Sequence, residues 1–209
     1  RRRTDRATSV REMTAPSTNG APSTVRRFEG AEAGELATQA AVFEDLQYVL
    51  RCCEHLVTAL APPQPDVAFV EALWTGALVG YVRCFSGRRS VLTEADLKEL
   101  QLDGDVTEFH DMIKKLRDHY ASRHLNPRES FTIGVAQFND GKPQGVAVIS
   151  TPRPLVDDTT VRLLGRVAYA LSGLLDARMQ KTQNDVLGAA GKLSPTDLAK
   201  LPVVHLAEG

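Results

Sequence analysis

The sequence lacks the features by which membrane proteins and many enzymes are recognised. It has no apolar run near the roughly 18 residues that a spanning helix needs, and no hydrophobic region follows its first arginines, so we expect no secretory signal and no membrane association. It contains no complete phosphate-binding loop, no Gly-x-Ser-x-Gly elbow, no His-Glu-x-x-His motif and no glycine fingerprint after a strand. Any chemistry must therefore come from scattered polar residues, and we expect neither a metal ion nor a cofactor.

Cysteine is also scarce, with only Cys52, Cys53 and Cys84 in the chain. An odd number that includes two adjacent residues argues against a disulfide framework and favours a reducing, cytoplasmic location. Cys52 and His55 have a spacing that zinc ligands use. We favour the simpler interpretation, in which the cysteines are small buried apolar side chains.

Charge is unevenly distributed along the 209 residues, although the net charge is only −1. Residues 1–30 carry seven arginines and three acidic residues, a net charge of +4, so the remainder carries −5. Because residues 1–30 also contain few large apolar side chains, we predict a disordered basic tail there and a single domain over 31–209. A basic tail on an acidic body indicates an anionic partner.

Apolar periodicity predicts a mainly α fold: an antiparallel bundle of four to five helices with one inserted β-hairpin. Alternating apolar residues on either side of the turn sequence Asn139-Asp140-Gly141 predict the hairpin over about 130–151. The helices are expected over about 32–61, 65–85, a short stretch from Thr93, 105–126, 157–183 and a short stretch from Ser194.

The hairpin needs a partner, because an isolated two-stranded sheet is marginally stable in water. It can cap one end of the bundle, or it can form a dimer with another chain. The sequence leaves both alternatives open.

A ladder of basic residues lies on the helix expected over 105–126. His110, Arg117 and His124 are seven residues apart, nearly two helical turns, so they would share one face. Histidine can transfer protons near neutral pH, and arginine can bind a phosphate through two donors. The alternative is a solvated helix end, where cations are favoured beside the last carbonyl groups. Further polar residues accompany the ladder: Asp118, His119, Arg123 and Asn126.

Arg83 is a second candidate, because it lies among apolar neighbours near the end of the second expected helix. A buried arginine requires a partner, for which Asp118 or Glu108 is available. One interpretation adds Arg83 and Arg89 to an anion pocket with Arg117. The other is an interhelical salt bridge with surface arginines.

Two segments carry a resemblance to a known superfamily. Residues 116–124, Leu-Arg-Asp-His-Tyr-Ala-Ser-Arg-His, look like the Arg-polar-x(n)-His motif of HEPN-type helical bundles. Residues 74–85, which end in Tyr-Val-Arg-Cys-Phe, resemble an uncharacterised bacterial group of HEPN-like proteins with a Leu-Arg-Asp-x-His stretch. The resemblance covers about residues 70–130.

The resemblance implies a helical homodimer in which Arg and His residues meet at the dimer cleft and cleave RNA without a metal. By this resemblance Arg117 would stabilise the phosphate, His124 would act as acid or base toward the ribose hydroxyl, and Asp118 would follow the motif arginine. The chain departs from the uncharacterised group in one respect. The motif histidine falls on Arg123, so that His124 comes one position late, which on a helix is a rotation of about 100°.

We therefore expect a HEPN-like RNA-binding protein, with or without metal-independent endoribonuclease activity, in a defence or toxin system. Its expected partners are RNA, a second copy of the chain and a protein such as an antitoxin. The alternatives are a non-enzymatic homodimeric interaction module with a degenerate HEPN-type site, and a small-molecule sensor lined by Trp74, Tyr81 and Phe85. The candidate catalytic residues are His110, Arg117, Asp118 and His124, and the candidate substrate-binding residues are Arg83, Arg89, His119, Arg123 and Asn126.

Overall fold

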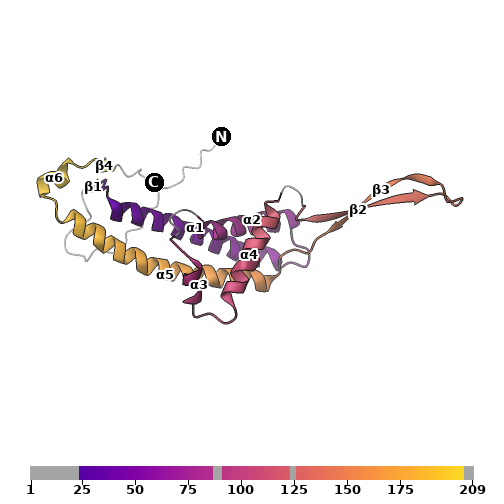
Figure 1. Cartoon of the computed structure of the whole chain (residues 1–209), viewed down its shortest axis with the longest axis horizontal. Coiled ribbons are helices and arrows are strands. Elements are labelled where there is room, and N and C mark those ends of the chain that lie inside the picture. Colours follow the sequence, from indigo (N-terminus) through magenta and orange to yellow (C-terminus); the bar gives the residue numbers. More distant parts are fainter. Residues whose placement is uncertain (1–23, 87–90, 123–125, 205–209) are drawn as a thin grey trace. The chain divides into compact units, whose positions relative to one another are not determined.

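The computed structural model describes residues 24–86, 91–122 and 126–204, and it is mainly helical (Figure 1). The mainly α prediction and the β-hairpin are confirmed, whereas the four-to-five-helix bundle stays a prediction. In chain order the elements are β1 (Val25–Arg26), α1 (Ala31–Leu60), α2 (Val67–Arg83), α3 (Glu94–Lys98), α4 (Val106–Tyr120), β2 (Glu129–Gln137), β3 (Pro143–Pro152), α5 (Asp158–Ala190), α6 (Pro195–Lys200) and β4 (Val203–Val204).

The chain divides into two compact units. One unit comprises the described parts of Arg1–Ala37 and Gln180–Gly209, and the other comprises Thr38–Met179. The prediction of a single domain over 31–209 stays a prediction. Within the described part of the chain, none of the helices combines the length and the apolarity that a membrane crossing requires.

The first unit contains a small sheet that composition did not predict. Val25 pairs with Val204 and Arg26 with Val203, in an antiparallel register between β1 and β4. Val25 and Arg26 fall inside the predicted basic tail of residues 1–30, whereas residues 1–23 lie outside the described residues.

Local sequence signals explain where several helices begin. The side chain of Asp105 accepts a hydrogen bond from the backbone N–H of Glu108 at 2.9 Å, as the spacing of these two residues predicted. Ser194 caps α6 in the same way, accepting from the N–H of Asp197 at 3.1 Å. Both side chains satisfy a backbone donor that has no partner within its own helix.

The core of Thr38–Met179 is apolar, and every helix of this unit contributes to it. On α1 the buried apolar line contains Leu46, Val49 and Leu56, whereas Leu50 and Val57 are half-buried. The largest fully buried side chains of the other helices are Trp74, Leu78 and Tyr81 of α2, Leu97 of α3, Ile113 of α4, and Leu164, Leu171 and Leu175 of α5.

A glycine allows α2 to approach α1 closely. A Cβ added at Gly80 of α2 would lie 3.1 Å from Cγ2 of Val49, which is closer than ordinary contact. Gly165 of α5 also faces α1, but a Cβ added there would lie 3.6 Å from Cβ of Cys53, which is an ordinary contact distance. Gly80 is therefore the position at which a side chain would hinder the packing of α2 against α1.

Polar contacts join α3 and α5 at one edge of this core. The guanidinium of Arg178 donates to the carbonyl of Val91 at 3.0 Å and pairs with the carboxylate of Asp96. Burial alone would raise the pKa of Asp96, but hydrogen bonds from Arg178 and Thr93 outweigh it and lower the pKa below its usual value. The charged pair therefore fixes the short helix α3 against α5.

The three cysteines are buried and free, as the simpler interpretation predicted. Burial raises the pKa of Cys53 and of Cys84 to about 12, and it also raises the pKa of Cys52. Their thiols therefore stay protonated at neutral pH. His55 is exposed beside the buried Cys52.

The hairpin of β2 and β3 is antiparallel and uncovered. Its turn contains Gly141 at φ +83°, and the side chain of Asp140 accepts from the N–H of Lys142 at 3.0 Å. All residues of both strands are exposed except Gly134, which is half-buried. Among the described residues no helix covers either strand, so the hypothesis of a cap over the bundle is wrong.

Truncation of two neighbouring side chains of α4 tests the core assignment. Ile113 is fully buried, whereas Met112 is 38% exposed. We expect Ile113→Ala to lower the free energy of unfolding by about 2–5 kcal/mol, because it leaves a cavity, and Met112→Ala to lower it by about 1 kcal/mol or less. Denaturant unfolding followed by circular dichroism measures both, and equal losses would contradict the assignment.

Candidate functional site

His110 is the central residue of the candidate site. It is only 1% exposed, because it follows Phe109 on the buried side of α4 and faces α2. Its Nδ1 lies 3.1 Å from the hydroxyl of Tyr81, and its ring meets that of Phe85 edge-on with centroids 4.5 Å apart. Two aromatic rings of the α2 end thus hold the imidazole in one orientation.

The environment keeps both members of the Tyr81–His110 pair neutral. Burial lowers the pKa of His110, and the nearby Lys114 lowers it further, against opposing effects of Glu94 and Asp111. Burial likewise raises the pKa of the Tyr81 hydroxyl. At neutral pH His110 is therefore an uncharged imidazole, with one nitrogen committed to Tyr81.

A cavity of about 320 Å³ opens beside His110. Its polar side is basic, since it contains Lys114 and Arg117 on the same face of α4 as His110, and Glu94 provides the one carboxylate among its lining residues. The lining residues are Val82, Phe85 and Ser86 at the end of α2, Leu92, Thr93 and Glu94 around the start of α3, and His110, Lys114 and Arg117 on α4.

Lys114 is held in this cavity by two carboxylates. Its ammonium lies 3.3 Å from Oε1 of Glu94 and 3.7 Å from Oδ1 of Asp111. Glu94, His110 and Asp111 each offer a metal-ligand atom, and these atoms lie within 4.8 Å of one another. Among the described residues they form a group that could hold a metal ion.

The guanidinium of Arg117 has an incomplete set of hydrogen-bond partners. Its Nε lies 3.0 Å from Oδ1 of Asp118, but the two groups are not aligned for a hydrogen bond, and Nε is buried without another acceptor. A buried N–H without an acceptor is costly, so an anion entering the cavity would gain from this donor. His110 and Arg117 thus line one cavity, as the predicted ladder required.

The helix α4 is shorter than the expected 105–126: it ends at Tyr120, where the N–H of Ala121 bonds to the carbonyl of Arg117. Pro127 sets only the latest possible end of the helix, and α4 ends before that limit. His124, Arg123 and Arg89 lie outside the described residues.

Arg83 does not join the cavity. Its guanidinium makes a two-pronged pair with Asp45 of α1, in which Nε lies 2.7 Å from Oδ2, so its partner is neither Asp118 nor Glu108. The interpretation as an interhelical salt bridge is confirmed. The three aromatic residues considered for a small-molecule sensor lie in two environments. Trp74 and Tyr81 are buried in the core, whereas Phe85 lines the cavity.

The remaining predicted residues have local structural contacts. The side chain of Asn126 accepts hydrogen bonds from the backbone N–H groups of Arg128 and Glu129 at 2.9 and 3.3 Å, which begins the turn into β2. The His119 ring lies beside that of Tyr120, with centroids 6.4 Å apart. These contacts give Asn126 and His119 roles at the ends of elements rather than in the cavity.

Sequence analysis missed Glu94 and Lys114 as members of the site. The two residues are 20 positions apart, on separate helices, and no spacing rule connects them. Tyr81 was noted for its aromatic ring, but its hydroxyl contact with His110, 29 positions away, carries no sequence signal. Only tertiary packing brings these groups together.

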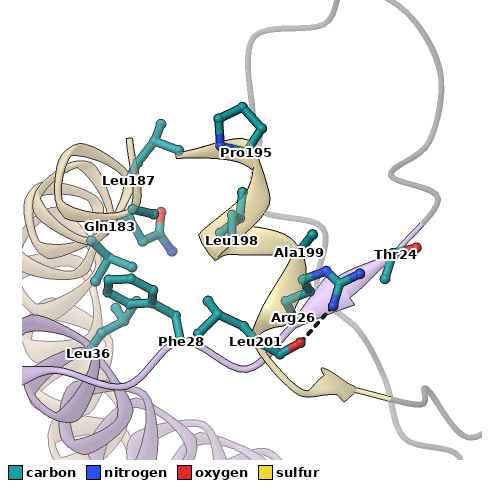
Figure 2. Close-up of a pocket in the computed structure, with 12 residues that line it drawn as sticks. Thr24, Arg26, Phe28, Leu36, Gln183, Leu187, Pro195, Leu198, Ala199 and Leu201 are labelled. Atoms are coloured by element: carbon teal, nitrogen blue, oxygen red, sulfur yellow. Dashed lines mark hydrogen bonds between the residues drawn. The ribbon is translucent and has the colours of Figure 1, made fainter. Parts of the chain in front are cut away.

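A second cavity, of about 540 Å³, has a different character and lies in the first unit, within the described parts of Arg1–Ala37 and Gln180–Gly209 (Figure 2). Leu36, Phe28 and Leu198 contribute to its apolar walls, and its one charged group, Arg26, donates a hydrogen bond to the carbonyl of Leu201 at 2.7 Å. A single arginine that is bonded to the backbone offers no partner for proton transfer, so this cavity is not the candidate site.

Comparisons with known proteins add no further assignment. No family model matches the chain, and no curated protein and no solved structure match it either. The functional argument therefore depends on the geometry of the described residues.

The buried, neutral His110 predicts a pH dependence of stability. Because its pKa is lower in the folded chain, the unfolded chain binds the additional proton, and stability should fall as the pH drops below about 6.5, the ordinary value. The slope for one proton is at most about 1.4 kcal/mol per pH unit.

Urea unfolding between pH 7.5 and 5.5 measures this dependence. His110→Gln removes the titrating group and should flatten the curve, whereas the matched variant His119→Gln leaves His110 in place and should retain the wild-type slope. A His110→Gln curve as steep as that of the wild type would refute the assignment.

Proposed function

We propose that this protein is a homodimeric interaction module whose hairpin, β2 with β3, packs against the same hairpin of a second copy. The observation that supports this proposal is an apolar face that no described part of the chain covers. The proposal includes an antiparallel bundle of four to five helices, a degenerate HEPN-type site and a cytoplasmic location.

The strand register places most of the large apolar side chains of β2 and β3 on one face. Ile133 pairs with Val148 and Val135 with Val146, and Phe131 extends the row. Because directly paired residues point to the same side of a sheet, these five side chains form a continuous patch, which we call the apolar hairpin face. They are between 53% and 72% exposed.

The opposite face of the hairpin has a different character. It carries Gly134 paired with Ala147, Ala136 paired with Gly145, and Thr132 paired with Ile149. Small and polar residues dominate there, with one large apolar side chain. This asymmetry is typical of a sheet with one buried and one solvated side.

A second copy of the chain is the occupant that best fits the apolar hairpin face. No charged side chain interrupts the face between Phe131 and Val148, so two copies would meet without like-charge repulsion. The face presents on the order of 500 Å² of apolar surface per copy, so a pair would bury about 1,000 Å², the lower bound of specific interfaces. The twofold contact would be isologous, with the same residues on both sides.

The candidate site supports a binding role over catalysis. His110 is buried and uncharged, Arg83 is committed to Asp45, and α4 ends before His124. General acid–base catalysis needs groups within reach of a substrate, and this arrangement offers few.

Two lysine substitutions on opposite faces of the hairpin test the dimer. Ile133→Lys puts a charge in the centre of the apolar hairpin face and should convert the dimer to a monomer of 22.8 kDa. Thr132→Lys, the adjacent residue on the other face, adds the same charge and should leave the dimer intact.

Light scattering and analytical ultracentrifugation over a concentration series measure the mass. A wild-type chain that stays monomeric at all concentrations would reject the proposal. Equal dissociation by both variants would show that charge, rather than the apolar face, controls association.

RNA binding, with metal-independent cleavage, is a second candidate function. The observation that favours it is the basic cavity, where Arg117 has a buried donor without an acceptor and Lys114 adds a second positive charge. A phosphate group of RNA fits such donors. In this hypothesis Arg117 binds the phosphate, while Asp118 and His124 would assist the reaction.

A short single-stranded RNA tests this second function. We expect Arg117→Ala to weaken RNA binding roughly tenfold and to lower the slope of log affinity against log salt concentration by about 1. The control variant Arg166→Ala changes an exposed residue of α5 and should bind RNA as the wild type does. Fluorescence anisotropy measures binding, and gel electrophoresis in EDTA measures cleavage, for which His124→Ala is the additional variant. Absence of binding by the wild type would eliminate the hypothesis.

A further inference from the structure

We propose that Glu94, His110 and Asp111 form a binding site for a divalent transition-metal ion, with Zn²⁺ as the best fit. One imidazole and two carboxylates suit Zn²⁺, which accepts mixed nitrogen and oxygen ligands. The three ligand atoms lie within 4.8 Å of one another. Ligands of one tetrahedral Zn²⁺ are about 3.4 Å apart, so side-chain movements of roughly an ångström would complete the site.

The buried His110 distinguishes this group from an ordinary surface cluster of acids. Nδ1 of His110 contacts the Tyr81 hydroxyl at 3.1 Å, which is the only hydrogen bond of this ring among the described residues. Nε2 is therefore the nitrogen left for the cavity that His110 lines. Metal-binding histidines commonly bind the metal through one ring nitrogen, while the other nitrogen bonds to a polar group that fixes the ring orientation and the tautomer.

The two carboxylates provide charge and access. Glu94 opens α3, Asp111 follows His110 on α4, and both side chains are more than half exposed. An ion can therefore enter from solvent while its third ligand lies in the interior. The cavity of about 320 Å³ leaves space for a water molecule as the fourth ligand.

In this structure the ammonium of Lys114 pairs with the two carboxylates that would bind the metal ion. Its ammonium lies 3.3 Å from Glu94 and 3.7 Å from Asp111, so it would compete with a metal ion for the same carboxylates. Because the Lys114 side chain is 41% exposed, it can move into solvent when an ion binds. Removal of Lys114 should therefore strengthen metal binding, which a purely structural salt bridge would not predict.

Calorimetric titration of the full chain with Zn²⁺ tests this inference. The wild type should bind one ion, Glu94→Gln and Asp111→Asn should each weaken binding at least tenfold, and Lys114→Gln should tighten it severalfold. Glu108→Gln, an exposed carboxylate elsewhere on α4, is the matched control and should bind as the wild type does. The two ligand variants are at exposed positions, so they test the site without disturbing the core around His110.

Titration with Co²⁺ identifies the ligand types independently of affinity. The expected spectrum has visible absorption of a nitrogen- and oxygen-ligated ion and no thiolate charge-transfer band. A thiolate band would show that the ion binds to cysteines instead, and it would overturn the proposal. It would also be overturned by a wild type that binds no Zn²⁺, by ligand variants that match the wild type, or by weaker binding in Lys114→Gln. None of these outcomes depends on the hairpin dimer, which mass measurements test separately.

Discussion

The contact between Tyr81 and His110 is the interaction on which the candidate site depends. It joins α2 to α4 in the interior, where a polar group without a partner would be costly, and it pairs the Tyr81 hydroxyl with Nδ1 of His110. Because His110 is held there, the polar residues one and two turns further along α4 are carried to the rim of the same cavity. Lys114 and Arg117 then face the start of α3, which the pair of Arg178 with Asp96 fixes against α5.

The hairpin presents the opposite physical situation. Its backbone is satisfied by the regular ladder between β2 and β3, but its apolar side chains have no partners among the described residues. The chain thus contains one region whose apolar side chains are buried and another whose apolar side chains are exposed. The exposed apolar patch is the feature on which the proposed homodimer is based.

Local features were predictable from the sequence, and nonlocal ones were not. The helices follow from apolar periodicity, the start of α4 from the spacing of Asp105 and Glu108, and the hairpin from its alternation and turn, because each depends on neighbouring residues. The end of α4 was placed too late because Pro127 gives only an upper limit.

The candidate site was predicted only in part. His110 and Arg117 were found by their spacing on one helix, but the partner of Arg83 proved to be Asp45, 38 positions away. Glu94 and Lys114 form an ion pair although they are 20 positions apart in the sequence. The hairpin is exposed because no described helix packs against it. These features are determined by tertiary packing, which no periodicity in the chain encodes.

The short pairing of β1 with β4 has a consequence for folding kinetics. These strands contribute two residues each, yet they join positions about 180 residues apart in the chain, and contacts of such high sequence separation form late in folding. Two residue pairs also provide little stabilisation, so this sheet should form late and open first. Amide protons of Arg26 and Val204 would then exchange with solvent long before those of the α2 core, and the first unit would behave as the least cooperative part of the molecule.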